Sequence, residues 1–142
     1  MAILLKIKFK IMAQRFSQKE AMIACWYLVL YVDKKSDKTS ERIQNKLMKR
    51  YGLWSEVDWD RFLEKWDKWQ NEDGPEKILN HCKKILDNAD YAIRIKTLAG
   101  MWSIAVDIGD KEWTDGESEY YIAMERALNV SRDDVKTEWK KI

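Results

Sequence analysis

The chain has 142 residues, of which 46% are hydrophobic and 35% are charged, and its formal net charge is +2. This apolar content supports the packed core of one domain and excludes an intrinsically disordered chain. Basic and acidic residues are interleaved, 26 against 24, without a basic stripe. Sequence-independent binding to nucleic acid is therefore not expected.

The first residues form an apolar segment that lysines interrupt, MAILLKIKFKI. It is too short to span a bilayer, and no small-residue cleavage site follows it, as a secretory signal peptide would require. We expect residues 1–16 to be an N-terminal appendage and residues 17–142 to form a single helical domain. We also expect no transmembrane segment and a cytoplasmic location.

The first expected helix runs from Ser17 to about Val32. Ser17 and Glu20 match a capping box, in which the serine oxygen accepts an amide hydrogen bond and the glutamate reaches back to the cap. The residues that follow are apolar on nearly every side, which indicates a buried helix. After the polar segment DKKSDKT, helical spacing of apolar residues predicts a second helix that ends at Gly52.

The third expected helix has Ser55 as its cap and a strongly aromatic face. The residues on this face are Trp59, Phe62, Leu63 and Trp66. Such a stripe could be a platform for bases or sugars, but the steps of three and four favour a core position. Trp54 and Trp69 lie less clearly on this face and are the better candidates for exposure.

The segment NEDGP is the clearest break in the chain, and its Pro75 suits the first position of a fourth helix. A fifth helix, at 91–106, is again apolar on most sides. Gly100 lies inside this helix, where glycine is unfavourable relative to alanine, so we expect another helix to pack closely against it.

A second capping box, from Thr114 to Glu117, is expected to open the sixth helix, which runs to Leu128. Ser131 then caps the seventh and last helix.

Two stretches of the chain, 26–66 and 102–142, follow one pattern at an offset of 76 residues. The aligned pairs include Trp26 with Trp102, Glu41 with Glu117, and Ser55 with Ser131. Each copy has a buried helix, an acidic loop, a glutamate in the first turn of an amphipathic helix, a short link and a last helix. The sequence therefore predicts an all-α fold of about seven helices, with two pseudo-repeated units around two buried central helices at 17–32 and 91–106.

This pattern resembles the TerB-like family, which is named for bacterial tellurite resistance. The family's unit is a buried helix, a loop with an aspartate, a hydrophobic residue and a glutamate that opens the next helix. In the second copy, Asp110, Trp113 and Glu117 stand at these positions, while Lys111 replaces the usual glycine. The resemblance covers about residues 17–142.

In the first copy, Asp33 or Asp37 fills the family's aspartate position and Glu41 its glutamate position. The resemblance implies a seven-helix cytoplasmic domain without enzymatic activity, which works as a helper module in bacterial stress response. It also implies a protein partner, for example in a membrane-associated stress complex. We expect a monomer or a homodimer.

The acidic residues of the two loops are candidate ligands of a divalent cation. They are Asp33, Asp37 and Glu41 in the first copy, and Asp107, Asp110, Asp115 and Glu117 in the second. Their hard oxygen atoms suit calcium or magnesium, although neither loop matches the calcium loop of EF-hands. The alternative is that these are solvated loop charges, with glutamates placed favourably at the positive starts of helices.

The remaining reactive residues give little support for catalysis. Cys25 and Cys82 lie among apolar residues and are expected to be reduced core thiols. His81, the only histidine, has no obvious serine or cysteine nucleophile as a partner, so we predict that the protein is not an enzyme.

Two other functions stay open. One is a helical bundle that binds a small ligand or lipid, suggested by eight tryptophans and six tyrosines. The other is an enzyme with carboxylate-based metal chemistry.

If the acidic loops bind a cation, titration with calcium or magnesium will shift the amide NMR resonances of Asp110 and Glu117, because a bound ion changes the field at both residues. Millimolar metal that moves no resonance near either residue would contradict the hypothesis.

Overall fold

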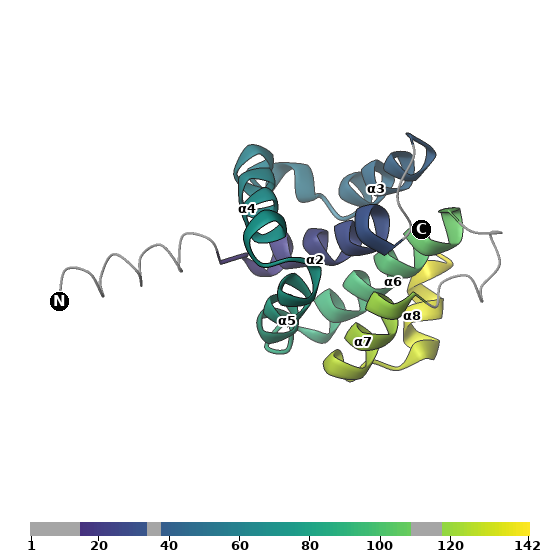
Figure 1. Cartoon of the computed structure of the whole chain (residues 1–142). Coiled ribbons are helices and arrows are strands. Elements are labelled where there is room, and N and C mark those ends of the chain that lie inside the picture. Colours follow the sequence, from purple (N-terminus) through teal and green to yellow (C-terminus); the bar gives the residue numbers. More distant parts are fainter. Residues whose placement is uncertain (1–14, 34–37, 109–117) are drawn as a thin grey trace.

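The computed structural model describes residues 15–33, 38–108 and 118–142, except for the side chains of residues 33, 38–41 and 108. Within these ranges the chain forms seven α-helices and no strand, so the all-α prediction is confirmed (Figure 1). The helices are α2 (Gln18–Tyr27), α3 (Lys38–Arg50), α4 (Trp59–Glu72), α5 (Pro75–Leu86), α6 (Tyr91–Ile108), α7 (Glu119–Leu128) and α8 (Arg132–Trp139). A π-helical turn, η1 (Leu28–Asp33), continues α2, and a 3₁₀ turn, η2 (Leu53–Ser55), precedes α4.

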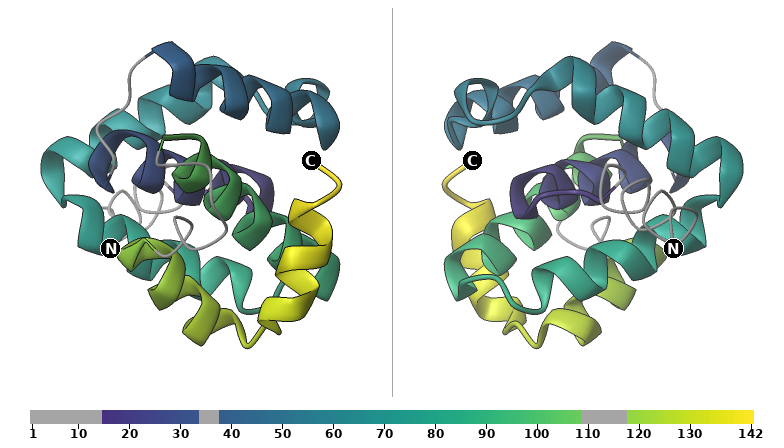
Figure 2. Two further views of the ribbon diagram at one scale, coloured as in Figure 1. Left: turned by 90° about the vertical axis from the view of Figure 1, so that its right-hand side faces the viewer. Right: turned by 90° about the vertical axis from the view of Figure 1, so that its left-hand side faces the viewer.

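Two helical segments contribute much of the buried surface. Every residue from Glu20 to Leu30 is buried, and so is every residue from Thr97 to Val106 in α6. α2 contacts α5 and α6, while α6 also contacts α3, α7 and α8. Figure 2 shows α3 and α4 on one side of α2 and α6, and α7 on the other. A helix that is apolar on nearly every side needs such neighbours in order to remove all its faces from water.

The closest approach between α2 and α6 occurs at Gly100. A Cβ atom on Gly100 would lie only 2.1 Å from Nε1 of Trp26. The indole N–H of Trp26 donates a hydrogen bond of 3.0 Å to the carbonyl oxygen of Thr97, which lies one turn earlier in α6. The close packing predicted at Gly100 is therefore confirmed, and its partner is the fully buried Trp26.

Several predicted helix ends agree with the structure. Ser17 and Glu20 form both hydrogen bonds of a capping box at the start of α2. Gly52 follows α3 with a φ of 65°, a left-handed conformation that glycine adopts without strain. Pro75 occupies the first turn of α5.

One predicted cap and one predicted helix start need correction. The N-cap of α4 is Asp58, whose carboxylate accepts a hydrogen bond from the amide of Arg61, and Ser55 instead lies in η2. Serine and aspartate are similarly good caps, and the short turn that buries Leu53 delays the helix start. α7 begins after Ser118, whose hydroxyl accepts from the amide of Tyr121. The capping box predicted at 114–117 lies outside the described residues.

The N-terminal end of the described chain takes part in the core. Phe16 is 2% exposed, and its ring lies 5.9 Å from that of Phe62. Phe16, which was predicted to belong to the appendage, is therefore part of the core. Residues 1–14 of the predicted appendage lie outside the described part. In the described ranges, no helix combines the length and apolar character needed to cross a bilayer.

Replacing Gly100 with alanine should lower the free energy of unfolding by up to about 2 kcal/mol. Overpacking a filled core costs about 1–3 kcal/mol, and this outweighs the gain of about 1 kcal/mol in helix propensity. Urea unfolding would measure the loss. In the Trp26→Phe background the same substitution should cost less, because the phenyl ring is shorter than the indole. Equal losses in both backgrounds would show that Trp26 is not the obstructing group.

Candidate functional site

Only one of the predicted cation ligands, Asp107, has a described side chain. The other side chains lie outside the described residues: Asp33, Asp37, Glu41, Asp110, Asp115 and Glu117. Among the side chains that are described, no three from histidine, cysteine, aspartate and glutamate gather where they could hold a metal ion. The cation site therefore stays a prediction.

Asp107 lies near the end of α6 and is 14% exposed. Its Oδ1 atom is 3.8 Å from Nη2 of Arg42, which belongs to the first half of α3. Its Oδ2 atom is buried, and no hydrogen-bond donor reaches it from the described residues. The start of α3 and the end of α6, which adjoin the two acidic segments, are thus close together. Arg42 of α3 faces Asp107 there, and nothing in the sequence indicated this pairing.

Asp107 lines a groove between α3, α6 and the end of the chain after α8. The groove consists of two hollows of about 430 and 390 Å³, which share Ile43 and Asp107. The described lining residues are Arg42, Ile43, Lys46, Ser103, Val106, Asp107, Trp139, Lys140 and Ile142. We call this the Asp107 groove. The larger hollow has an apolar wall formed by Ile43, Val106, Trp139 and Ile142, and the exposed cations of the groove are Arg42, Lys46 and Lys140.

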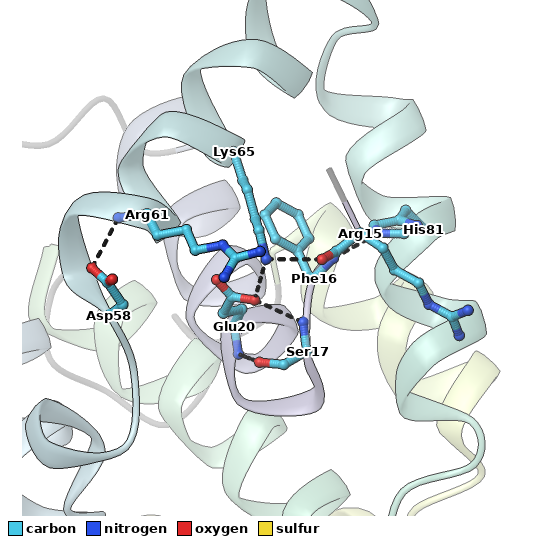
Figure 3. Close-up of polar contacts among 8 residues, drawn as sticks. All are labelled: Arg15, Phe16, Ser17, Glu20, Asp58, Arg61, Lys65 and His81. Carbon is cyan, nitrogen blue, oxygen red and sulfur yellow. Dashed lines mark hydrogen bonds and ion pairs between the residues drawn. The ribbon is translucent and has the colours of Figure 1, made fainter. Parts of the chain in front are cut away.

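A second polar cluster holds the start of α2 against α4 (Figure 3). Nζ of Lys65 lies 2.7 Å from Oε1 of Glu20, and these side chains are only 11% and 9% exposed. Lys65 also donates to the carbonyl oxygen of Arg15, and Glu20 accepts from the amide of Ser17. A buried ion pair is tolerated when further hydrogen bonds satisfy both partners, as they do here.

Sequence reasoning missed this ion pair. The position of Lys65 could have indicated the pair, because this lysine falls on the aromatic face of α4, three residues after Phe62 and four before Trp69. A lysine in such a stripe indicates a buried acidic partner, because an unpaired ammonium group would be strongly unfavourable there.

His81 stabilises the same end of the fold. Its Nε2 accepts a hydrogen bond of 3.1 Å from the amide of Phe16. Its ring stacks on Trp69, with 4.5 Å between centroids, so Trp69 is not the exposed residue that was predicted. Burial lowers the pKa of His81 to about 4, with help from the positive charges of Arg15, Lys84 and Lys65. The ring is therefore neutral near pH 7, and its basic nitrogen is already engaged.

Both cysteines are buried and unbridged, as predicted. Burial raises the pKa of the Cys82 thiol, and a hydrogen bond with Cys25 raises it further. A thiol of this kind is a poor nucleophile at neutral pH.

An exposed group of aromatic side chains forms a distinct surface. Trp54 is 47% exposed, as predicted, and Tyr31 is 39% exposed. The ring of Trp54 lies 5.1 Å from that of the half-buried Trp59. Trp59 and Tyr31 both contact the buried ring of Tyr27, at 5.9 and 4.8 Å. We call Tyr31, Trp54 and Trp59 the aromatic surface. Within the α4 stripe, Phe62 and Trp66 are buried core residues, whereas Trp59 and Leu63 are partly buried against the core.

Comparison with known proteins gives no relative: no family model matches the chain, and no curated protein or solved structure does either. Function is therefore inferred from the chain's own surfaces. Within the described residues, the aromatic surface and the Asp107 groove are the two surface features from which a function is proposed.

Stability should fall as the pH is lowered from 6.5 to about 4, the interval between the ordinary pKa of histidine and that of His81 in the fold. In this interval the unfolded chain binds a proton that the folded chain does not, so protonation favours unfolding. Because the ring is only half-buried, we expect this effect to be about 1–2 kcal/mol.

Urea unfolding of the wild type and of His81→Gln, measured at pH 7 and pH 4, isolates the contribution of His81, because glutamine offers an acceptor that does not titrate. The wild type should lose more stability than the variant. Parallel losses would show that His81 is not the responsible group.

Proposed function

We propose that this chain is a non-catalytic helical interaction module, similar to TerB-like stress-response proteins, that binds a protein partner in the bacterial cytoplasm. The aromatic surface is the observation that carries this proposal. Tryptophan and tyrosine are enriched at the energetic centres of protein interfaces. An exposed Trp54 beside the half-buried Trp59 provides rigid apolar area that water solvates poorly.

The order of the helices supports the family-like architecture of two repeated units. With the offset of 76 residues, the positions of α2, α3 and α4 in the chain overlap those of α6, α7 and α8. Trp26 and Trp102, which the offset of 76 residues aligns, are both fully buried, in α2 and α6 respectively. In this proposal α2 and α6 are the central helices of the two units, and α5 bridges them.

The engagement of the reactive side chains in the fold supports a role other than catalysis. The basic nitrogen of His81 accepts the Phe16 amide, and both thiols lie in the core. A residue that serves the core in this way is poorly placed to meet a substrate.

The weak binding of a divalent cation by the acidic loops is a further part of the proposal. Of the candidate ligands only Asp107 has a described side chain, and its carboxylate already faces the guanidinium of Arg42. In this proposal the cation is therefore bound by Asp110, Glu117 and the first acidic cluster, and Asp107 stays beside Arg42.

The aromatic surface can be tested by affinity capture from cells that express the protein natively. Trp54→Ala should weaken the affinity for a direct partner by about thirtyfold, the effect of losing about 2 kcal/mol at an interface centre, and recovery of that partner should fall accordingly. Trp54→Phe should retain most of the binding, because it keeps an aromatic ring.

Lys77→Glu is the matched control for this experiment, since Lys77 is exposed on α5 and lies outside the aromatic surface. Quantitative mass spectrometry would compare the variants, and thermal melts would verify that each one folds. Equal recovery of every protein by the wild type and by Trp54→Ala would contradict the proposed contact.

A further inference from the structure

We infer that the Asp107 groove binds a short acidic peptide segment that carries a bulky apolar residue. The groove shares no residue with the aromatic surface, so this inference does not depend on that surface. Three features of the groove lead to this class of ligand: a carboxylate oxygen without a donor, an apolar wall and a cationic rim.

The carboxylate of Asp107 needs a hydrogen-bond donor. Its Oδ2 atom is buried without a partner among the described residues, while Oδ1 lies 3.8 Å from Nη2 of Arg42, which is beyond hydrogen-bond distance. Buried polar atoms in folded proteins are almost always hydrogen-bonded. A main-chain N–H of an extended peptide is a donor that could enter the groove and satisfy Oδ2.

The wall beside Asp107 suits an apolar side chain. The larger hollow, of about 430 Å³, is lined by the half-buried Ile43, Trp139 and Ile142 and by the buried Val106. This volume falls in the range of ligand pockets, which combine mostly apolar walls with a few polar groups that orient the ligand. A leucine or phenylalanine of the peptide would cover the exposed parts of these residues.

The rim selects for negative charge. Arg42, Lys46 and Lys140 line the groove, and Asp107 is the one carboxylate side chain among its described lining residues. The side chain of Arg42 is 74% exposed, and Lys46 and Lys140 are also exposed. Cations at such a rim attract an acidic partner and disfavour a basic one. An extended chain can place acidic residues on both sides of its apolar residue and so reach both hollows.

The test is fluorescence anisotropy with a labelled synthetic peptide, Asp-Glu-Leu-Phe-Asp-Glu, added to the full chain at low ionic strength. Two control peptides replace either Leu-Phe with Ser-Gly or the acidic residues with lysine. The first peptide should bind at least about tenfold more tightly than either control.

Charge reversal at the rim gives the sharpest variant. Lys46→Glu combined with Lys140→Glu should weaken binding by about tenfold or more, because both cations become repulsive. The matched control combines Lys77→Glu with Lys84→Glu, which makes the same change in net charge on α5 with exposed lysines outside the groove. This control should bind like the wild type.

Asp107→Ala should weaken binding by about fivefold, whereas Asp107→Asn, which keeps an acceptor oxygen, should retain most of it. Trp54→Ala should leave peptide binding unchanged, which separates this test from that of the aromatic surface. The inference is overturned if no peptide binds, if either control peptide binds equally well, or if the rim reversal has no greater effect than its α5 control. Thermal melts establish that every variant is folded.

Discussion

The contact between Trp26 and Gly100 sets the distance between the two most buried helical segments. The large indole of α2 lies where α6 has no side chain, and a single added carbon atom would meet the ring at 2.1 Å. The buried indole N–H is satisfied by the Thr97 carbonyl oxygen. Since α6 also contacts α3, α7 and α8, the position of α6 on α2 determines where these helices can pack. Steric fit and hydrogen bonding thus act together at the contact between α2 and α6.

Polar groups stabilise the other end of α2. Glu20 caps the helix and pairs with Lys65 of α4, and His81 of α5 accepts the Phe16 amide. These bonds tie the start of the described chain to two helices that come much later in the sequence. They also engage the single histidine and a buried carboxylate in contacts that stabilise the fold.

The aromatic surface and the Asp107 groove have different chemical characters. The aromatic surface is an extension of the core, because Tyr31 and Trp59 contact the buried Tyr27 and Trp54 contacts Trp59. The Asp107 groove is formed where the end of α6 meets α3 and the residues after α8, and it combines an apolar wall with cations and one carboxylate. Under the proposed function, the aromatic surface would contact an apolar patch of a partner and the groove a charged segment, at separate places.

The sequence by itself determined the helices, their caps in large part, and the burial of α2 and α6. These properties depend on residues within a turn or two of each other, such as the Ser17–Glu20 box or the repeated apolar positions. It also indicated that Gly100 would meet another helix. It did not choose between Ser55 and Asp58 as the cap of α4, because both are good caps and the packing of Leu53 decides.

Only the tertiary structure decided which distant residues meet. Glu20 and Lys65 are 45 positions apart, and Phe16 and His81 are 65 apart. Arg42 reached Asp107 only because α3 packs on α6. Such contacts depend on the angles and distances at which helices pack, and helical periodicity contains no information about these. For the same reason, the sequence identified Asp107 as a candidate ligand but did not reveal the groove around it. It also predicted that Trp54 is exposed, but not which aromatic residues lie beside it.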